Sequence, residues 1–344
     1  MATDTEAPPG ILLQCFGSQA MPLTLAQCVD KAVWNEFVCS SPQGNVFCTT
    51  PFIEALGAPF ELWLLKKGEQ IQAGAIVLSG EDGRPLQAPF PSTWYMGVLL
   101  AKFVGEMPAH SRVETGLAIV NELCAAFGER YTRISFCLHP RFEDLRSFSW
   151  FHYHEPERGQ FTIDLRYTGW IDLTASKDFE SFLATVRSTR RYDYRRALAK
   201  GLTVEVSTDI ALLERLQALT FARQDLAMNP QEAKLLRAIA SAALAHKFGE
   251  MRVCRDAAGE PASATLFLFH KDTGYYYVGA NDPAHHHLNS GTFIFLDNVQ
   301  NCMRRGLKFI DTCGINSPNR GGFKTSFNAA PQPYFIVTWN KPSA

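Results

Sequence analysis

The sequence lacks a long apolar run. No stretch of its 344 residues approaches the ~20 consecutive apolar residues that a membrane-spanning helix requires. Hydrophobic residues make up 46% of the chain and charged residues 19%, a balance typical of globular proteins, and the length is sufficient for two hydrophobic cores. We therefore expect a soluble globular protein with no transmembrane segment.

The sequence also lacks a targeting leader and paired cysteines. Residues 1–24 contain neither a basic segment followed by an apolar one nor a run of arginines, so they match neither a secretory signal nor a transit peptide. The nine cysteines are scattered without any Cys-x-x-Cys pair, which argues against a zinc site or a disulfide framework. We expect a cytoplasmic protein with reduced thiols.

A charge excess of either sign is missing as well. The 33 basic residues are balanced by 34 acidic ones, so the chain as a whole does not attract nucleic acid over long range. We expect no DNA partner, and any contact with a polyanion such as tRNA has to be local.

The expected strands and helices follow the same order in both halves of the chain, namely three strands, a helix and a further strand. We place them at residues 60–68, 70–80, 93–100, 111–127 and 133–138 in the first half, and at 250–255, 262–270, 274–280, 289–305 and 307–313 in the second. A Ser-x-x-Glu capping box at Ser111 and Glu114 is expected to start the first helix, and Gly128 to end it.

The repeated order indicates a duplicated α+β unit. The composition shifts near residues 156–172, before a new helical region, so we expect one mixed sheet flanked by helices in residues 1–160 and another in 161–344. The repeat is one of pattern and not of identity, and two unrelated α+β domains are the alternative.

A basic helix opens the second half. After an apolar face, residues 187–200 carry six cations. These are Arg187, Arg190, Arg191, Arg195, Arg196 and Lys200. A solvated helix face accounts for such a cluster. On a nearly neutral chain, contact with a phosphate of a substrate, a coenzyme or RNA is the other interpretation.

Three segments carry a family resemblance. They are residues 34–50 (WNEFVCSSPQGNVFCTT), 186–206 (VRSTRRYDYRRALAKGLTVEV) and 306–337 (GLKFIDTCGINSPNRGGFKTSFNAAPQPYFIV). The first segment is expected to form a helix that begins with tryptophan and ends in a turn of small residues. The second is expected to form an arginine-rich helix followed by a strand. The third is expected to form a strand followed by a glycine loop and the tripeptide Gly-Phe-Lys. These patterns resemble the FemAB/FemX-like acyltransferases, which consist of two tandem GNAT (N-acetyltransferase-like) domains.

The resemblance implies an activity. Proteins of that family transfer an acyl group from acyl-CoA or from an aminoacyl-tRNA to an amine or a hydroxyl. We therefore expect direct acyl transfer with no bound cofactor, and a small-molecule or cell-envelope precursor bearing a phosphate or carboxylate as the acceptor. The alternative is a non-catalytic protein that binds a glycan, a carrier or RNA on a degenerate GNAT fold.

The resemblance also singles out Lys324 as a catalytic residue. In the aminoacyl-tRNA branch of the family, the lysine of a Phe-Lys pair lies in the acceptor cleft, and Phe323 and Lys324 match that pair. In an extended segment, Phe323 and Thr325 would face one side while the Lys324 ammonium pointed outward from the other. It would then bind a substrate anion or the reaction's oxyanion. A lysine that reaches solvent beside buried rings is the alternative.

Further contacts follow from the same reasoning. The expected substrate-binding residues are Phe323, Phe327, Arg190, Arg191, Arg195 and Tyr277. By likeness to the GNAT fold, the expected donor-binding residues are Gly279, Ala280, Asn289, Ser290 and Gly291. That helix start retains only Gly291 of the usual Arg/Gln-x-x-Gly-x-Gly/Ala pyrophosphate loop, so it departs from an ordinary acetyl-CoA site.

The candidates for a general base are Asp311, Asp282 and His287. Asp311 ends a strand before the glycine loop, so we expect it to face the same cleft as Lys324 and assign it as catalytic. A cap on the following loop is the alternative for Asp311, as turn formation is for Asp282. Three consecutive histidines at 285–287 cannot all reach one ion, so no metal site is expected.

Overall fold

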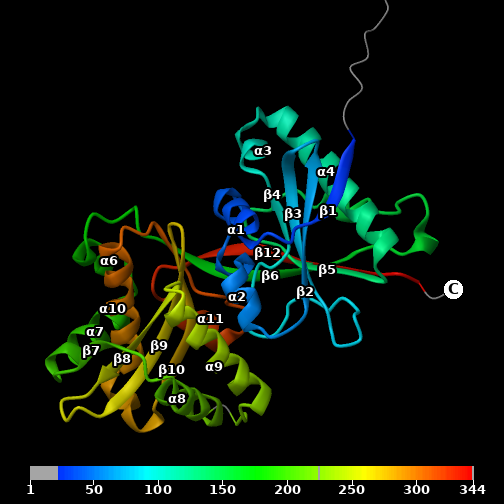
Figure 1. The fold of residues 1–344 in the computed structure, drawn as a ribbon. Coiled ribbons are helices and arrows are strands. Elements are labelled where there is room, and N and C mark those ends of the chain that lie inside the picture. The colour runs from blue at the N-terminus through cyan, green and yellow to red at the C-terminus, as the bar shows by residue number, and fades with distance from the viewer. Residues whose placement is uncertain (1–21, 224, 343–344) are drawn as a thin grey trace, which may run out of the picture.

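The computed structural model describes residues 22–223 and 225–342. It contains two sheets, a four-stranded one in the order β1-β2-β3-β4 and an eight-stranded one in the order β5-β12-β6-β11-β10-β9-β8-β7 (Figure 1). The predictions for the first 21 residues, including Cys15, lie outside the described part of the chain.

The four-stranded sheet is antiparallel and belongs to the first half. Its strands are β1 (Leu23–Gln27), β2 (Phe60–Lys67), β3 (Gln70–Leu78) and β4 (Val98–Leu100). The helices of this half are α1 (Lys31–Ser40), η1 (Val46–Cys48), α2 (Thr50–Ala55), α3 (Lys102–Glu106), α4 (Ala109–Arg130) and α5 (Arg146–Ser149). The fully buried Trp34 of α1 donates its indole N–H to the carbonyl of Cys48 at 2.8 Å, which fixes α1 against the segment that enters α2.

The eight-stranded sheet runs through both halves. Its strands are β5 (Arg133–Cys137), β12 (Ala330–Asn340), β6 (Thr162–Asp172), β11 (Phe309–Asp311), β10 (Thr273–Asn281), β9 (Pro261–His270), β8 (Gly249–Arg255) and β7 (Thr203–Ser207). The last strand, β12, pairs antiparallel with β5 on one side and with β6 on the other. The end of the chain therefore joins a strand of the first half to the sheet of the second, and the domain boundary near residue 160 stays a prediction.

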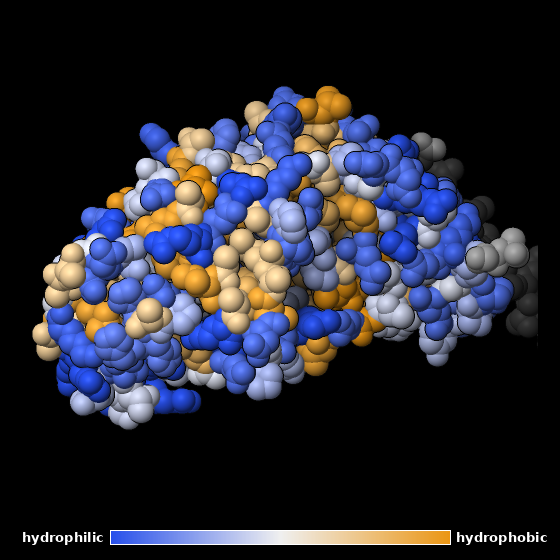
Figure 2. Space-filling model, turned by 90° about the horizontal axis from the view of Figure 1, so that it is seen from below, coloured by the Kyte–Doolittle hydropathy of each residue, from blue (hydrophilic) through white to orange (hydrophobic). Residues whose placement is uncertain are grey.

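Helices cover both faces of the second-half sheet. They are η2 (Pro156–Arg158), α6 (Phe179–Thr185), α7 (Ser188–Ala199), α8 (Ile210–Ala222), α9 (Pro230–Ala245), η3 (Pro283–Leu288), α10 (Ser290–Arg304) and α11 (Pro318–Thr325). Helix α10 packs on one face of the sheet, with α6 and α7 beside it. Helices α8 and α9 pack against β8–β10 on the other face, in a hydrophobic core that continues into the first half. Seen from below, hydrophilic residues cover most of the surface and apolar ones show between them near the middle (Figure 2). No helix in the described ranges is both long and apolar enough to cross a membrane.

The structure corrects several expected boundaries. The expected strand at 93–100 is regular only as β4, over Val98–Leu100. The capping box at Ser111 and Glu114 is wrong, because α4 already begins at Ala109, after Pro108 as N-cap residue without a side-chain cap. Gly128 lies inside α4, where a Cβ would come within 3.2 Å of the Phe151 ring, so this glycine makes room for packing and does not end the helix.

The segment expected to be extended at 322–327 is wrong as well. Pro318 opens helix α11, which runs to Thr325, since proline is well suited to a first helical turn. A Cβ on Gly321 would lie 2.8 Å from the carbonyl oxygen of Ile315. Gly321 therefore permits close packing within a helix, where the sequence had indicated a flexible turn, while Gly322 has open space around it.

Candidate functional site

The pairing of two parallel strands ends near the centre of the eight-stranded sheet. Strands β10 and β11 pair over three positions, ending where Tyr275 meets Asp311. Beyond that position β10 has an irregular register with β9 between Tyr276 and Val278, and Cys313 takes a left-handed backbone with φ of 53°. We call the place where this pairing ends the strand opening.

Lys324 lies directly at the strand opening. Its Nζ donates to the carbonyl oxygens of Gly314 at 2.8 Å and Cys313 at 3.3 Å, and lies 5.8 Å from the centroid of the Tyr276 ring. Burial lowers the pKa of this ammonium. The expectation that Lys324 points outward from an extended segment is wrong, because helix α11 aims its side chain into the protein.

An aromatic cluster supports this lysine. Phe323 and Phe327 lie with ring centroids 4.9 Å apart, and the fully buried Phe327 lies 4.3 Å from Phe295 of α10. These contacts fix the end of α11 against α10, so the backbone that carries Lys324 is rigidly placed. The structure therefore brings the predicted Phe323, Lys324 and Phe327 together.

Arg190 completes this group from α7. Its Nε donates to the hydroxyl of Ser326 at 2.8 Å and one terminal nitrogen to that of Thr292 at 3.1 Å. Its guanidinium carbon also lies 4.8 Å from the Phe323 ring centroid, and burial lowers its pKa. Arg190 therefore links α7, the first turn of α10 and the end of α11.

The other predicted substrate contacts lie elsewhere. Arg191 donates hydrogen bonds to the carbonyls of Ala184 and Val186 at the C-terminal end of α6. Arg195 is exposed on α7. Tyr277 lies on the opposite face of β10 from Tyr276, where its hydroxyl donates to the carbonyl of Ser92 at 2.9 Å. None of these three residues is brought to Lys324.

The predicted donor-binding residues lie at the end of β10 and the start of α10. A Cβ on Gly279 would lie 1.7 Å from the hydroxyl oxygen of Tyr276, whose ring covers this glycine. Ala280 is buried, and Asn289 has a left-handed backbone with φ of 60° immediately before α10. The Gly279 position is thus explained by packing of Tyr276, with no ligand needed to account for it.

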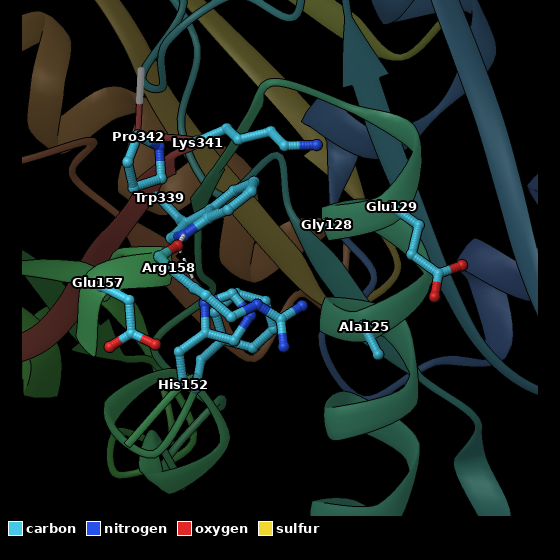
Figure 3. A pocket seen from close by; sticks show the side chains of 10 residues that line it. Ala125, Gly128, Glu129, His152, Glu157, Arg158, Trp339, Lys341 and Pro342 are labelled. Carbon is cyan, nitrogen blue, oxygen red and sulfur yellow. Dashed lines mark hydrogen bonds between the residues drawn. The ribbon is translucent and has the colours of Figure 1, made fainter. Parts of the chain in front are cut away.

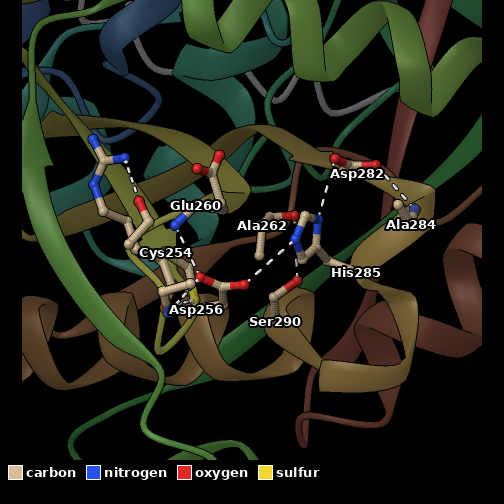
Figure 4. A network of polar contacts seen from close by, with 11 residues as sticks. Cys254, Asp256, Glu260, Ala262, Asp282, Ala284, His285 and Ser290 are labelled. Carbon is tan, nitrogen blue, oxygen red and sulfur yellow. Dashed lines mark hydrogen bonds and ion pairs between the residues drawn. The ribbon is translucent and has the colours of Figure 1, made fainter.

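A network of acidic groups lies beside the start of α10 (Figure 4). The two ring nitrogens of His285 lie 3.1 Å from an oxygen of Asp282 and 3.6 Å from one of Asp256, and Ser290 donates to the carbonyl of Ala262. Asp282 also accepts a hydrogen bond from the backbone N–H of Ala284, which fits the alternative that it forms a turn. Across the described residues, no cluster of His, Cys, Asp and Glu is arranged to hold a metal ion.

Asp311 is fully buried at the base of the strand opening. Its carboxylate accepts from the Thr168 hydroxyl at 2.6 Å, the backbone N–H of Cys313 at 2.7 Å and the Trp170 indole at 2.8 Å. Burial raises the pKa of this carboxyl. The geometry matches a cap on the loop after β11, and the catalytic assignment of Asp311 stays a prediction.

Two buried threonines test how much this network stabilises the fold. The Thr168 hydroxyl donates to Asp311 and accepts from the backbone N–H of Gly314, whereas the buried Thr312 hydroxyl has no hydrogen-bond partner among the described residues. We expect Thr168→Val to lower the free energy of unfolding by about 1–3 kcal/mol and Thr312→Val to leave it nearly unchanged. Urea unfolding of both variants measures this, and equal losses would contradict the role given to Thr168.

Lys324 does not line either of two cavities found in the described residues. One of about 520 Å³ is bounded by α4 and the end of β12 and is lined by Ala125, Gly128, Glu129, Phe151, His152, Glu157, Arg158, Trp339, Lys341 and Pro342 (Figure 3). A smaller recess between the halves includes His139, Arg141, Trp170, Lys271 and Asp311 in its lining. The residues that line this recess come from segments far apart in the sequence, so no sequence pattern could have predicted that they lie together.

Comparisons with known proteins bear on the fold. Residues 184–324 match the family model described as the acetyltransferase (GNAT) domain. The crystal structure of FemX superposes with a TM-score of 0.66 at 13% identity, covering 92% of this chain and 97% of that one. None of the curated proteins compared with the chain matches it in sequence.

Two further solved structures have the same fold. A tandem GNAT protein from the clavulanic acid biosynthesis pathway gives a TM-score of 0.52 at 12% identity, covering 94% of this chain and all of that one. A conserved protein of unknown function from Bacteroides thetaiotaomicron gives 0.53 at 11%, covering 93% and 100%. The chain therefore has the tandem GNAT fold of FemX, which confirms the expected fold class.

Proposed function

From this FemX-like tandem GNAT fold, we propose that the protein is an acyltransferase that moves an acyl group directly from acyl-CoA or an aminoacyl-tRNA to an amine or hydroxyl. The observation that carries the proposal is the strand opening between β10 and β11 with Lys324 beside it. In the reaction, the thioester or ester bond of the donor breaks as the acceptor's new C–N or C–O bond forms. The acceptor's proton leaves, and the donor's thiol or ribose hydroxyl regains one.

Lys324 is the residue proposed to assist this step. Its ammonium is held by two carbonyls and buried beside Tyr276, so it is already positioned before the reaction. A fixed cation in a site with little water stabilises the negative oxygen of a tetrahedral intermediate far better than a mobile one. We keep Asp311 as the candidate that takes the acceptor's proton, since its raised pKa favours proton uptake.

The donor is the less constrained part of the proposal. A coenzyme A pyrophosphate would rest at the start of α10, where Asp256 and Asp282 place two carboxylates around His285 (Figure 4). These charges weigh against a pyrophosphate at that helix start. Exposed arginines on and beside α7, namely Arg187, Arg195 and Arg196, instead favour a donor with a phosphate backbone.

We propose a small-molecule or cell-envelope precursor with an anionic group as the acceptor.

A non-catalytic binding role is the second candidate. The observation in its favour is that the strand opening is filled by the protein's own side chains. Tyr276 covers Gly279, Lys324 bonds to the loop after β11, and Arg190 bridges α10 and α11. A protein that had lost its donor site while keeping the fold would have such an opening.

Calorimetric titration with coenzyme A and, separately, with bulk charged tRNA at two salt concentrations tests the proposal. Saturable coenzyme binding selects acyl-CoA as the donor. Binding of tRNA that weakens steeply with salt, and further in the variant Arg195→Gln/Arg196→Gln, selects aminoacyl-tRNA. The absence of both would overturn the proposed donors and favour the binding role.

A further inference from the structure

The recess between the two halves contains two cations, Arg141 and Lys271, that form no ion pair within the described residues. It is lined by Gly44, His139 and Arg141 of the first half and by residues of β6, β9, β10, β11 and the β9–β10 turn. Asp311 lies on its lining and also anchors the loop that Lys324 contacts. The Asp311 carboxylate therefore connects the recess to the strand opening. The recess itself lies on the face of the sheet opposite to Tyr276.

Arg141 is the first of these cations. Its guanidinium carbon lies 5.5 Å from the Trp170 ring centroid and 5.8 Å from that of Phe309. Within residues 22–223 and 225–342, no carboxylate lies within ion-pair distance of this guanidinium. The two rings hold the charge in place without neutralising it, so its N–H groups keep their capacity to bind an anion.

Lys271 is the second cation. It lies in the β9–β10 turn with a left-handed backbone, φ 52°, and its Nζ donates to the carbonyl of Ser41 at 2.6 Å. That bond spans the two halves and uses one of the three ammonium N–H groups. Burial lowers the pKa of Lys271, and the nearby charge of Arg141 contributes to the same shift. Two cations are thus held near each other, an arrangement that a bound anion would relieve.

His139 adds an uncharged donor. The backbone N–H of Arg141 donates to its Nδ1 at 3.1 Å, so the neutral ring carries its proton on Nε2. Burial, with the charges of Arg141 and Lys271, lowers the pKa of His139 to about 3. The ring therefore stays neutral at physiological pH and offers an N–H donor inside the recess.

The acidic groups around the recess have other partners. Asp272 lies 3.7 Å from Lys308 in an ion pair and accepts from the Thr273 hydroxyl. Asp311 accepts three hydrogen bonds from Thr168, Trp170 and the Cys313 backbone. Neither carboxylate forms an ion pair with Arg141 or Lys271 in the part of the chain that the structure describes, so both cations can still contact an anion.

We propose that this recess is an anion subsite, in which Arg141, Lys271 and the His139 ring bind a phosphate or carboxylate group. It rests on the proposed function in one respect, since we assign the anion to the acceptor of acyl transfer. Of the predicted cationic contacts, Arg190 binds two hydroxyls and Asp193 and Lys324 is assigned to the oxyanion, whereas Arg141 has no ion-pair partner within the described ranges. The subsite holds the acceptor across both halves, next to the base of the strand opening.

Titration calorimetry of the full chain with inorganic phosphate, and separately with acetate, at constant ionic strength tests the subsite. We expect saturable binding of one of the two anions, and at least about tenfold weaker binding in Arg141→Gln. Lys271→Gln is expected to weaken binding by a smaller factor. The matched control is Arg130→Gln, because Arg130 lies 4.2 Å from the Trp63 ring but outside the recess.

The two anions distinguish the kinds of acceptor, since preference for phosphate indicates a phosphorylated one and preference for acetate a carboxylic acid. Failure of both to bind the wild-type protein would overturn the subsite, as would equal losses in Arg141→Gln and Arg130→Gln. Neither donor is present in this experiment. An anion site without any donor binding would therefore preserve the subsite while counting against the proposed transfer, and the two outcomes stay distinguishable.

Discussion

Replacing Gly279 with alanine is expected to lower the free energy of unfolding by about 3 kcal/mol or more. The added Cβ would lie 1.7 Å from the Tyr276 hydroxyl oxygen and 2.5 Å from the ring carbon that bears it. Tyr276 cannot move aside easily, because its ring packs edge-on against Phe295 with centroids 4.9 Å apart and beside Phe267 at 5.5 Å. Relief of the clash requires displacement of a buried aromatic cluster.

Two glycines nearby in the fold serve as controls for this variant. A Cβ on Gly291 would meet the side-chain oxygen of Asn281 at 2.6 Å, the end of a side chain that can rotate, so Gly291→Ala is expected to cost less. Gly322 has nothing within 4 Å of the added Cβ and lies in helix α11, where alanine is expected to be neutral or to stabilise by up to about 1 kcal/mol. Urea unfolding of the three variants measures the order.

A double variant identifies the cause of the loss. If the Tyr276 ring is responsible, Gly279→Ala is expected to cost much less in a Tyr276→Ala background than in the wild type, because the clashing atoms are gone. An undiminished cost in that background would show that the backbone of β10, and not Tyr276, requires glycine at this position.

The fold could be predicted because its strands and amphipathic helices leave local patterns. The apolar run of β9 and the apolar face of α10 are visible in the sequence alone, and the expected strands at 60–68, 70–80 and 250–255 correspond to β2, β3 and β8. Helix α11 was misassigned because two adjacent glycines normally indicate a turn. Here only Gly321 is required for close packing, against the carbonyl of Ile315 in the loop before α11, while Gly322 has open space around it. The glycine pair therefore lies inside a helix and does not form the turn that it normally indicates.

The sequence predicted which residues lie at the site, but not the direction of their side chains or the groups that they contact. Lys324 and Arg190 were identified, yet their partners are carbonyls of the loop after β11, a hydroxyl of α10 and the hydroxyl of Ser326 at the end of α11. Such contacts depend on the packing of distant segments. Arg141 carried no signal, because the role proposed for it depends on its having no ion-pair partner in the described part of the folded chain. Position along the chain says little about which charges remain unneutralised after folding.

Substitution of Lys324 by methionine is expected to slow acyl transfer by about 100- to 1000-fold, the effect of removing one preorganised stabiliser of an oxyanion. Methionine has a similar length and apolar character, so the packing beside Tyr276 is retained. The measurement is donor consumption above the uncatalysed rate, using the donor that binds in calorimetry. The control is Lys102→Met, since Lys102 is an exposed partner of Glu106 on α3. Equal rates in both variants would remove Lys324 from the mechanism.

The pH dependence of stability shows whether the Lys324 ammonium is buried in solution as the geometry requires. Burial lowers its pKa in the folded protein below the ordinary value of 10.5. Below the lowered pKa both states hold the proton, and the wild type bears the full cost of burying the charge. As the pH rises from there towards 10.5, the folded protein loses this proton before the unfolded chain does, so the wild type should gain stability relative to Lys324→Met. A difference between the two proteins that stays constant across this range would mean that the ammonium is solvated, and an oxyanion would then gain little from it.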